Sequence, residues 1–125
     1  MALATGVDII EVARVEAVLA RHGERFLQRI FTARELAICG DRPERLAGRY
    51  AVKEAVSKAL GTGIGDFRWQ DVEILADERG KPELVLHETA LELANALELT
   101  EWAISLSHTA THAIGFAVAQ SGTQS

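Results

Sequence analysis

The segment from Pro43 to Gly61 constrains the fold more than any other part of the chain. Proline is favoured in the first turn of a helix and glycine just past its end, and no further proline interrupts the residues between these two. The pattern predicts a long helix over residues 43–60, against which the remaining elements must pack. At 125 residues, we expect the chain to form a single domain.

Shorter elements are predicted on both sides of this helix. An apolar run broken by Asp8 indicates a strand, and apolar residues at helical spacing before Gly23 indicate a helix. Thr32 and Glu35 have the spacing of a capping box. The predicted strands are residues 3–12, 70–75, 83–86, 102–107 and 113–119, and the other helices start near residues 12, 24, 33 and 87. This order predicts an α+β fold, with antiparallel strands packed against the long helix and a polar tail after about residue 120.

Composition and charge exclude several classes of protein. Cys39 is the single cysteine and no apolar stretch approaches the roughly 20 residues of a membrane span, so we expect a cytoplasmic protein that uses no membrane. A net charge of −5 and the lack of an aromatic stacking set argue against a nucleic-acid partner. Residues 14–58 nevertheless carry ten basic and six acidic side chains, whereas residues 66–101 carry three and ten. The basic half indicates an anionic partner at one surface.

Asp8, Glu54 and Lys58 are the first candidates for chemistry. An acid within an apolar strand costs stability unless it has a partner, so Asp8 is either a local cap or a metal ligand. Glu54 and Lys58 share a helix face, which is also the pattern of an ordinary surface pair contributing about 0.3–0.5 kcal/mol. Two hard carboxylates together would suit Mg²⁺ completed by water and substrate phosphates. Arg49 and Lys53 are paired in the same way on an adjacent face.

A second candidate is a row of arginines. Arg14, Arg21 and Arg25 point within roughly 20° of one direction if one helix carries all three, and Val18 lies on the same face. The row is either a solvated stripe or a docking ridge for an acidic helix. His108 follows two serines but forms no hydrolase motif with them.

Five segments in this order resemble the signatures of the holo-acyl-carrier-protein synthases, a short and homotrimeric class of 4′-phosphopantetheinyl transferases. They are residues Gly6–Val15, Phe31–Glu35, Arg49–Gly61, Gly80–Pro82 and Ser105–Thr109. The resemblance spans about residues 5–119. It implies the α+β fold of that superfamily, a homo-oligomer that is a trimer, and active sites in clefts between neighbouring subunits.

The resemblance also implies a reaction. The enzyme would transfer 4′-phosphopantetheine from coenzyme A to a serine of an apo acyl carrier protein, release adenosine 3′,5′-bisphosphate and support fatty acid biosynthesis. Mg²⁺ would bind to Asp8 and Glu54, with water in place of a third protein ligand. Glu54, directly or through a metal-bound water, or alternatively Lys58, would accept the serine proton.

Further residues are implicated by the same resemblance. Those implied to bind coenzyme A are Arg49, Lys53, Lys58, Gly61, Gly63, Gly80, Lys81, Pro82, Ser107, His108 and Thr109. Those implied to bind the carrier protein are Arg14, Val18, Arg21 and Arg25. Two alternatives stay open, a non-catalytic coenzyme A or nucleotide module and a protein that only docks an acidic partner. Neither needs both Asp8 and Glu54 together with Lys58.

Overall fold

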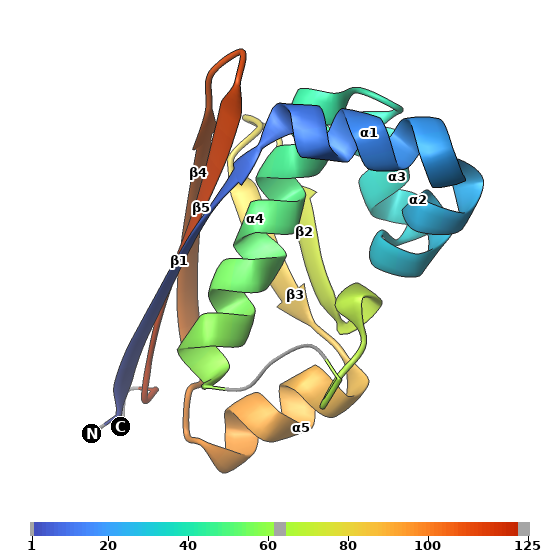
Figure 1. The fold of residues 1–125 in the computed structure, drawn as a ribbon. Helices are drawn as coiled ribbons and strands as arrows, with labels where there is room; N and C mark the ends of the chain where they lie inside the picture. The colour runs from blue at the N-terminus through green and yellow to red at the C-terminus, as the bar shows by residue number, and fades with distance from the viewer. Residues whose placement is uncertain (1, 62–64, 123–125) are drawn as a thin grey trace.

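The computed structural model describes residues 2–61 and 65–122. A three-stranded antiparallel sheet of order β1-β5-β4 lies on one side of helix α4, and the hairpin of β2 and β3 lies on the other side (Figure 1). The strands are β1 (Leu3–Glu11), β2 (Val72–Ala76), β3 (Pro82–Leu86), β4 (Glu101–His108) and β5 (His112–Gln120). The helices are α1 (Val12–His22), α2 (Glu24–Ile30), α3 (Ala33–Cys39), α4 (Pro43–Leu60) and α5 (Glu88–Ala96), with a 3₁₀ turn, η1, at Trp69–Asp71. The predicted α+β fold is confirmed.

Helix α4 is the centre of the molecule, with twelve of its eighteen residues buried. Pro43 is its first residue, and Gly61 ends it in the left-handed conformation with φ 77°. From Leu46 to Leu60, only Tyr50, Glu54 and Lys58 are not buried. Because these three are spaced four residues apart, they form one stripe along the helix, and that stripe is the part of the helix left open to a ligand.

Two glycines allow the sheet to approach α4 closely. A Cβ placed on Gly6 of β1 would lie 1.8 Å from the carbonyl oxygen of Ala55, and one on Gly115 of β5 would lie 2.4 Å from Ala51 C. Both contacts are with helix backbone, which cannot move aside. Asp8 pairs directly with Gly115 in the β1–β5 ladder, and side chains two apart in a strand share a face. Asp8 therefore faces α4, at the point of closest approach.

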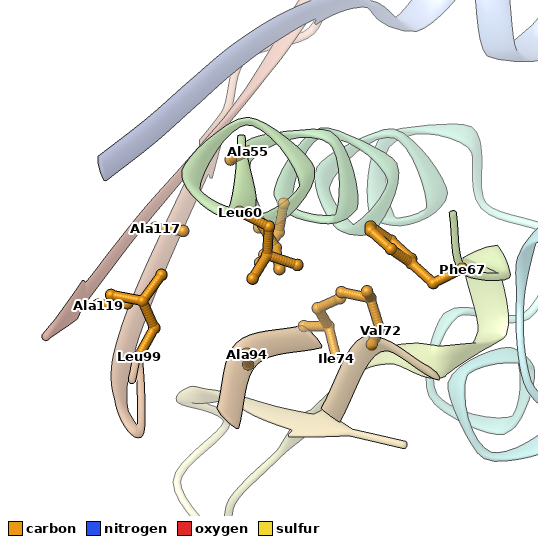
Figure 2. Packing of buried hydrophobic residues seen from close by; sticks show 12 residues of the cluster. Ala55, Leu60, Phe67, Val72, Ile74, Ala94, Leu99, Ala117 and Ala119 are labelled. Atoms are coloured by element: carbon orange, nitrogen blue, oxygen red, sulfur yellow. The ribbon is translucent and has the colours of Figure 1, made fainter. Parts of the chain in front are cut away.

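The buried side chains form two clusters on the two ends of α4. The larger one joins α4 to β2, α5 and β5, and Leu60, Phe67 and Ile74 are among its members (Figure 2). The other joins α1, α2 and α3 to the first turns of α4, through residues such as Val15 and Leu46. These two cores fix α4 against β2, α5 and β5 at one end and against α1, α2 and α3 at the other, which positions the stripe of Tyr50, Glu54 and Lys58.

The outer face of the three-stranded sheet is apolar and uncovered in the single chain. Val7 pairs with Phe116 and Ile9 pairs with Ile114 across the β1–β5 ladder, and these four side chains are 42–63% exposed. Large apolar side chains gathered on one face are typical of an interaction surface. In the part of the chain that the structure describes, no helix is both long and apolar enough to cross a membrane.

Most predicted element boundaries agree with the structure, including the stop at Gly23; the start of the strand after Phe67 and the straight row of arginines differ. The capping box of Thr32 and Glu35 is present at the start of α3. Gln70 was predicted to begin a strand, but it lies in η1. The first helix ends at His22 because Gly23 has φ 48°, so Arg25 belongs to α2 and does not continue the row of Arg14 and Arg21.

Candidate active site

Asp8, Glu54 and Lys58 meet where β1 crosses α4. The Lys58 Nζ donates hydrogen bonds to the Val7 carbonyl oxygen at 2.9 Å and to Asp8 Oδ1 at 3.1 Å. Glu54 lies one helical turn before Lys58, on the same stripe. Strand and helix thus bring together residues that are about fifty positions apart in the sequence, as the interpretation of Asp8 as a partnered acid requires.

A groove of about 250 Å³ opens beside this cluster. Asp8 and Glu54 contribute the acidic part of its wall, and Arg14 of α1 contributes a positive charge. The other residues that line it are Ile9, Ile10, Val15, Val18, Phe26 and Tyr50. A charged end with an apolar wall can orient a ligand that has both a polar head and an apolar arm.

The charges in the groove perturb one another. Burial raises the pKa of Glu54, and the negative charge of Asp8 raises it further, while Lys58 opposes the rise. Burial also raises the pKa of the Tyr50 hydroxyl, followed by the charges of Glu54 and Asp8, with Arg14 acting in the opposite direction. Perturbed groups that share a cleft are typical of functional sites. Tyr50, which also lines the groove, is therefore a candidate site residue that was not predicted, although its position four residues before Glu54 places it on the same face.

A second groove of about 500 Å³ continues from the first along α1 and α2. The two share Val18, Phe26 and Tyr50. The second groove is further lined by His22, Arg25, Arg29, Ile30 and Trp69. The Trp69 ring stacks on Tyr50 with centroids 5.0 Å apart and an interplanar angle of 26°. An apolar floor with a basic rim thus leads directly to the acid cluster.

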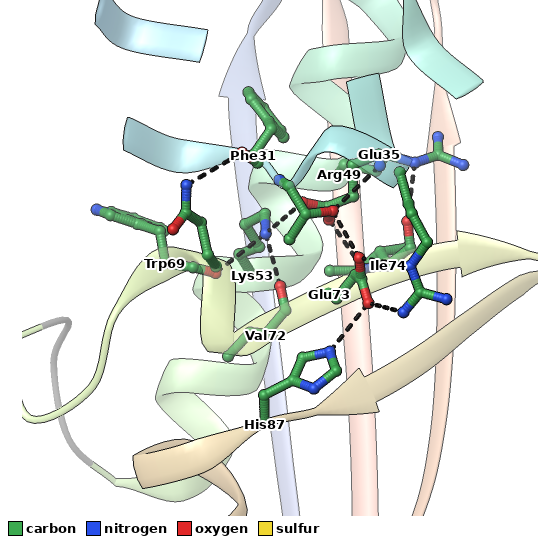
Figure 3. Close-up of polar contacts among 12 residues, drawn as sticks. Phe31, Glu35, Arg49, Lys53, Trp69, Val72, Glu73, Ile74 and His87 are labelled. Carbon is green, nitrogen blue, oxygen red and sulfur yellow. Dashed lines mark hydrogen bonds and ion pairs between the residues drawn. The ribbon is translucent and has the colours of Figure 1, made fainter. Parts of the chain in front are cut away.

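Arg49 and Lys53, which were predicted to contact phosphate, lie away from the groove in the single chain. Lys53 is completely buried, and its Nζ donates to Glu35 Oε1 at 2.9 Å, to the Trp69 carbonyl at 3.0 Å and to the Val72 carbonyl at 2.6 Å (Figure 3). These three bonds use all the hydrogens of the ammonium. Arg49 is also buried, and its Nε donates to the Ile74 carbonyl at 3.2 Å. Both side chains fasten α4 to β2, and Lys53 also to the turn before it, on a different face from the groove.

Buried acids complete this attachment. Glu35, fully buried, accepts from the Thr32 and Ile74 amides in addition to Lys53. Burial lowers the pKa of Lys53, and Glu35 opposes that change. Glu73, 2% exposed, accepts from Thr32 Oγ1, from Arg34 and from His87 Nε2 (Figure 3). Burial would raise the pKa of Glu73, but these three hydrogen bonds outweigh it and lower the pKa.

The remaining residues assigned to coenzyme A do not line the groove of Asp8. Lys81 and Pro82 line a separate hollow of about 370 Å³ against β4, together with Trp102. The other assigned positions are Gly61 after α4, Gly80 in the β2–β3 turn, and Ser107, His108 and Thr109 where β4 leads into β5. Gly63 lies outside the described residues. A single chain thus leaves β1 with Asp8 at one edge of the three-stranded sheet, and β4 with its candidate residues at the other edge.

The four predicted carrier-binding residues lie near the grooves to different degrees. Arg14 lines the first groove, Val18 lines both, and Arg25 lines the second. Arg21 is exposed on α1 and lines neither groove. The three arginines thus come from two helices and do not form one straight ridge. Arg14 and Arg25 border the apolar floor of the grooves, whereas Arg21 lies outside them.

The acid pair has the chemistry of a magnesium site. Mg²⁺ in proteins is commonly held by one or two carboxylates, with waters and substrate phosphates completing the octahedron. Asp8 and Glu54 line the same groove and interact electrostatically. Within residues 2–61 and 65–122, no group of three or more histidines, cysteines and acids is arranged to hold a metal ion. The donor set therefore fits a cation that is completed by solvent and substrate oxygens.

Comparison with known proteins identifies the family. Residues 4–117 match the family model of the 4′-phosphopantetheinyl transferase superfamily. The chain is 42% identical over 123 residues to the holo-(acyl-carrier-protein) synthase of Herpetosiphon aurantiacus, covering 93% of this chain and 97% of the relative. It is 44% identical to the synthase of Moorella thermoacetica over 122 residues, covering 95% and 94%.

Solved structures agree with this match. The holo-(acyl-carrier-protein) synthase of Helicobacter pylori in complex with coenzyme A superposes with a TM-score of 0.85 and 32% identity, covering 93% of this chain and 99% of that one. The synthase of Bacillus anthracis, also in complex with coenzyme A, gives a TM-score of 0.79 and 35% identity, covering 97% and 100%. With the α+β fold and the family model in agreement over most of its length, this chain belongs to the 4′-phosphopantetheinyl transferase superfamily.

Proposed function

We propose that this protein is a holo-(acyl-carrier-protein) synthase, which transfers 4′-phosphopantetheine from coenzyme A to a serine of an apo carrier protein. It would act in the cytoplasm as a single domain and support fatty acid biosynthesis. The observation that carries the proposal is that Asp8 and Glu54 line one groove, with Lys58 beside them and bonded to Asp8. Relatives at 42–44% identity carry this name, and two similar structures are complexes with coenzyme A.

Asp8 and Glu54 would hold Mg²⁺ against the diphosphate of coenzyme A. When bound, the cation would neutralise charge on the diphosphate as its bond breaks and the 5′-phosphate of adenosine 3′,5′-bisphosphate leaves, and it would help to align the in-line attack of the carrier serine. Lys58 lies beside Asp8 and would contribute a further positive charge to phosphate oxygens. Arg14 lines the same groove and would offer a planar pair of donors to a phosphate or a carboxylate.

Glu54 is the better of the two candidate bases. Its pKa is raised, which makes its carboxylate a stronger proton acceptor than an ordinary glutamate. Lys58 donates hydrogen bonds to the Val7 carbonyl and to Asp8, as an ammonium does, and an ammonium has no lone pair that could accept a proton. Glu54 would therefore accept the proton of the carrier serine, directly or through a water.

The two grooves and their basic rim would receive the carrier. Carrier proteins of this reaction are expected to be acidic, and opposite potentials speed encounter and fix register. Arg14, Arg25 and Arg29 surround the apolar floor of Val18 and Phe26. An apolar carrier side chain on this floor would place the adjoining serine near Glu54.

A complete site would need a second copy of the chain. The residues assigned to the nucleotide end of coenzyme A, such as Lys81 and His108, lie on or beside β4, at the sheet edge opposite Asp8. The exposed apolar face of Val7, Ile9, Ile114 and Phe116 would bury itself in such an assembly. We propose a homotrimer, and an active monomer in analytical ultracentrifugation at assay concentration would contradict it.

A mass measurement tests the proposed reaction. The protein is incubated with coenzyme A, Mg²⁺ and an apo acyl carrier protein, and the carrier is weighed by mass spectrometry. A gain equal to one phosphopantetheine group, absent when the carrier serine is replaced by alanine, is expected. Binding of coenzyme A without any gain on fatty-acid or polyketide carriers would favour the non-catalytic module.

A further inference from the structure

Lys58 is bound to β1 although its side chain is 55% exposed. Its ammonium donates to both the Val7 carbonyl and Asp8 Oδ1, so it bridges the C-terminal part of α4 to the strand. An exposed lysine usually stays in solvent, because ordering it costs side-chain entropy and a surface ion pair contributes little. Because the ammonium has two acceptors on the same strand, the Lys58 side chain is held in one position against β1.

The ammonium also lies within the field of two carboxylates. Lys58 Nζ lies 3.1 Å from Asp8 Oδ1, and Glu54 is one helical turn before Lys58 on the same stripe and lines one groove with Asp8. Without the lysine, the pair of acids would carry two unbalanced negative charges. With it, one carboxylate oxygen of Asp8 is already occupied by a positive charge that the protein itself supplies.

We propose that Lys58 is an internal counter-ion, which occupies Asp8 in the metal-free protein and competes with the divalent cation for it. The inference rests on the proposed function, since it takes Asp8 and Glu54 as the metal ligands. A divalent cation on Asp8 must either displace the ammonium from Oδ1 or share the carboxylate with it. Like charges at such short range repel even through solvent, so the lysine keeps the affinity for the bare cation low.

The competition has a consequence for the order of binding. A diphosphate brings negative charge that can accept the displaced ammonium, so cation and donor substrate should bind the site more favourably together than separately. Lys58 would then be released from Asp8 only when phosphate oxygens are present to receive it. Its 55% exposure leaves room for that movement.

Metal binding in the absence of coenzyme A tests the proposal without relying on turnover. The affinity of the full chain for Mn²⁺ is measured by electron paramagnetic resonance of the free ion, for the wild type and for Lys58→Met, Lys58→Arg, Lys81→Met and Asp8→Asn. Lys58→Met should bind Mn²⁺ about tenfold more tightly, a change of about 1.4 kcal/mol. Lys58→Arg keeps the charge, and Lys81 lies outside the groove, so both of those variants should bind like the wild type.

The other outcomes are distinguishable. If Lys58→Met binds Mn²⁺ no more tightly than the wild type while Asp8→Asn binds it more weakly, the counter-ion inference is wrong and the metal site stands. If Asp8→Asn binds Mn²⁺ as well as the wild type does, the metal site itself is wrong. Circular dichroism of Lys58→Met should match that of the wild type, and Lys58→Gln provides a second neutral variant.

Discussion

Replacing Lys53 separates a structural role from a catalytic one. In Lys53→Met, the fully buried carboxylate of Glu35 keeps only the Thr32 and Ile74 amides as donors. The carbonyls of Trp69 and Val72 lose the Lys53 hydrogen bond as well. Removing one partner of a buried ion pair costs about 3–5 kcal/mol, against a total stability of about 5–15 kcal/mol for a typical domain. We expect a marked loss of stability and a fully formed active groove in the molecules that stay folded.

Urea unfolding followed by tryptophan fluorescence measures this loss. With a denaturant slope of about 2 kcal/mol per molar urea, a loss of about 4 kcal/mol lowers the midpoint by about 2 M. The matched control is the double variant Lys53→Met/Glu35→Leu, which should recover only part of the stability. It removes the unpaired buried carboxylate, but it also leaves the Thr32 and Ile74 amides without their Glu35 acceptor.

Steady-state kinetics complete the test. In the absence of urea, the KM of Lys53→Met for coenzyme A should equal that of the wild type, because Lys53 does not reach the groove. A variant as stable as the wild type but with a much higher KM for coenzyme A would refute this reasoning and restore Lys53 as a phosphate ligand.

Three further perturbations test the fold and the docking surface. Gly115→Ala places a methyl group 2.4 Å from the backbone of α4 and should lower the free energy of unfolding by about 1–3 kcal/mol or more. The control is Gly48→Ala, whose methyl group meets only the movable end of Leu106 and which should be nearly neutral in the same urea titration. The pKa of Glu73 is lowered in the folded state, so its stabilisation is present above the ordinary value of 4.5 and lost as the pH falls below it. In Glu73→Gln, the melting temperature should therefore fall less steeply as the pH is lowered below 4.5, and an unchanged fall would exclude Glu73 as its source. Arg14→Glu or Arg21→Glu should raise the KM for the carrier far more than the KM for coenzyme A, with a smaller effect at high salt. Near-wild-type kinetics would indicate that the arginines are only a solvated stripe. Equal losses for both substrates would indicate damaged folding.

Local chemistry explains what the sequence predicts well. Pro43 and Gly61 determine the ends of α4 through their own backbone preferences, and Thr32 with Glu35 forms a complete capping box within four residues. Strand β1 follows from its apolar pattern, and Asp8 stands out because it breaks that pattern. These features need no knowledge of the rest of the fold.

Tertiary packing decides what the sequence does not reveal. Helical spacing places Arg49 with Lys53 and Glu54 with Lys58 on two faces, but it does not say which face meets solvent. With α4 enclosed by a sheet and a hairpin, the first pair becomes a buried attachment to the β2 segment and the second lines the open stripe. The residues near η1 differ from prediction for a related reason, since a carbonyl of that turn accepts from the buried Lys53.

The most direct test of the proposed enzyme is the rate of carrier modification when one acid of the pair is removed. Asp8→Ala and Glu54→Ala are compared with Glu92→Ala, an exposed acid on α5, by mass spectrometry of the carrier over a Mg²⁺ titration. Removing a metal ligand should lose several kcal/mol of transition-state stabilisation, and each 1.36 kcal/mol is a factor of ten in rate. Both site variants should therefore be slower by about a hundredfold or more, whereas the rate of Glu92→Ala should be unchanged. Normal rates for Asp8→Ala and Glu54→Ala at low Mg²⁺ would contradict the assignment of this groove as the active site.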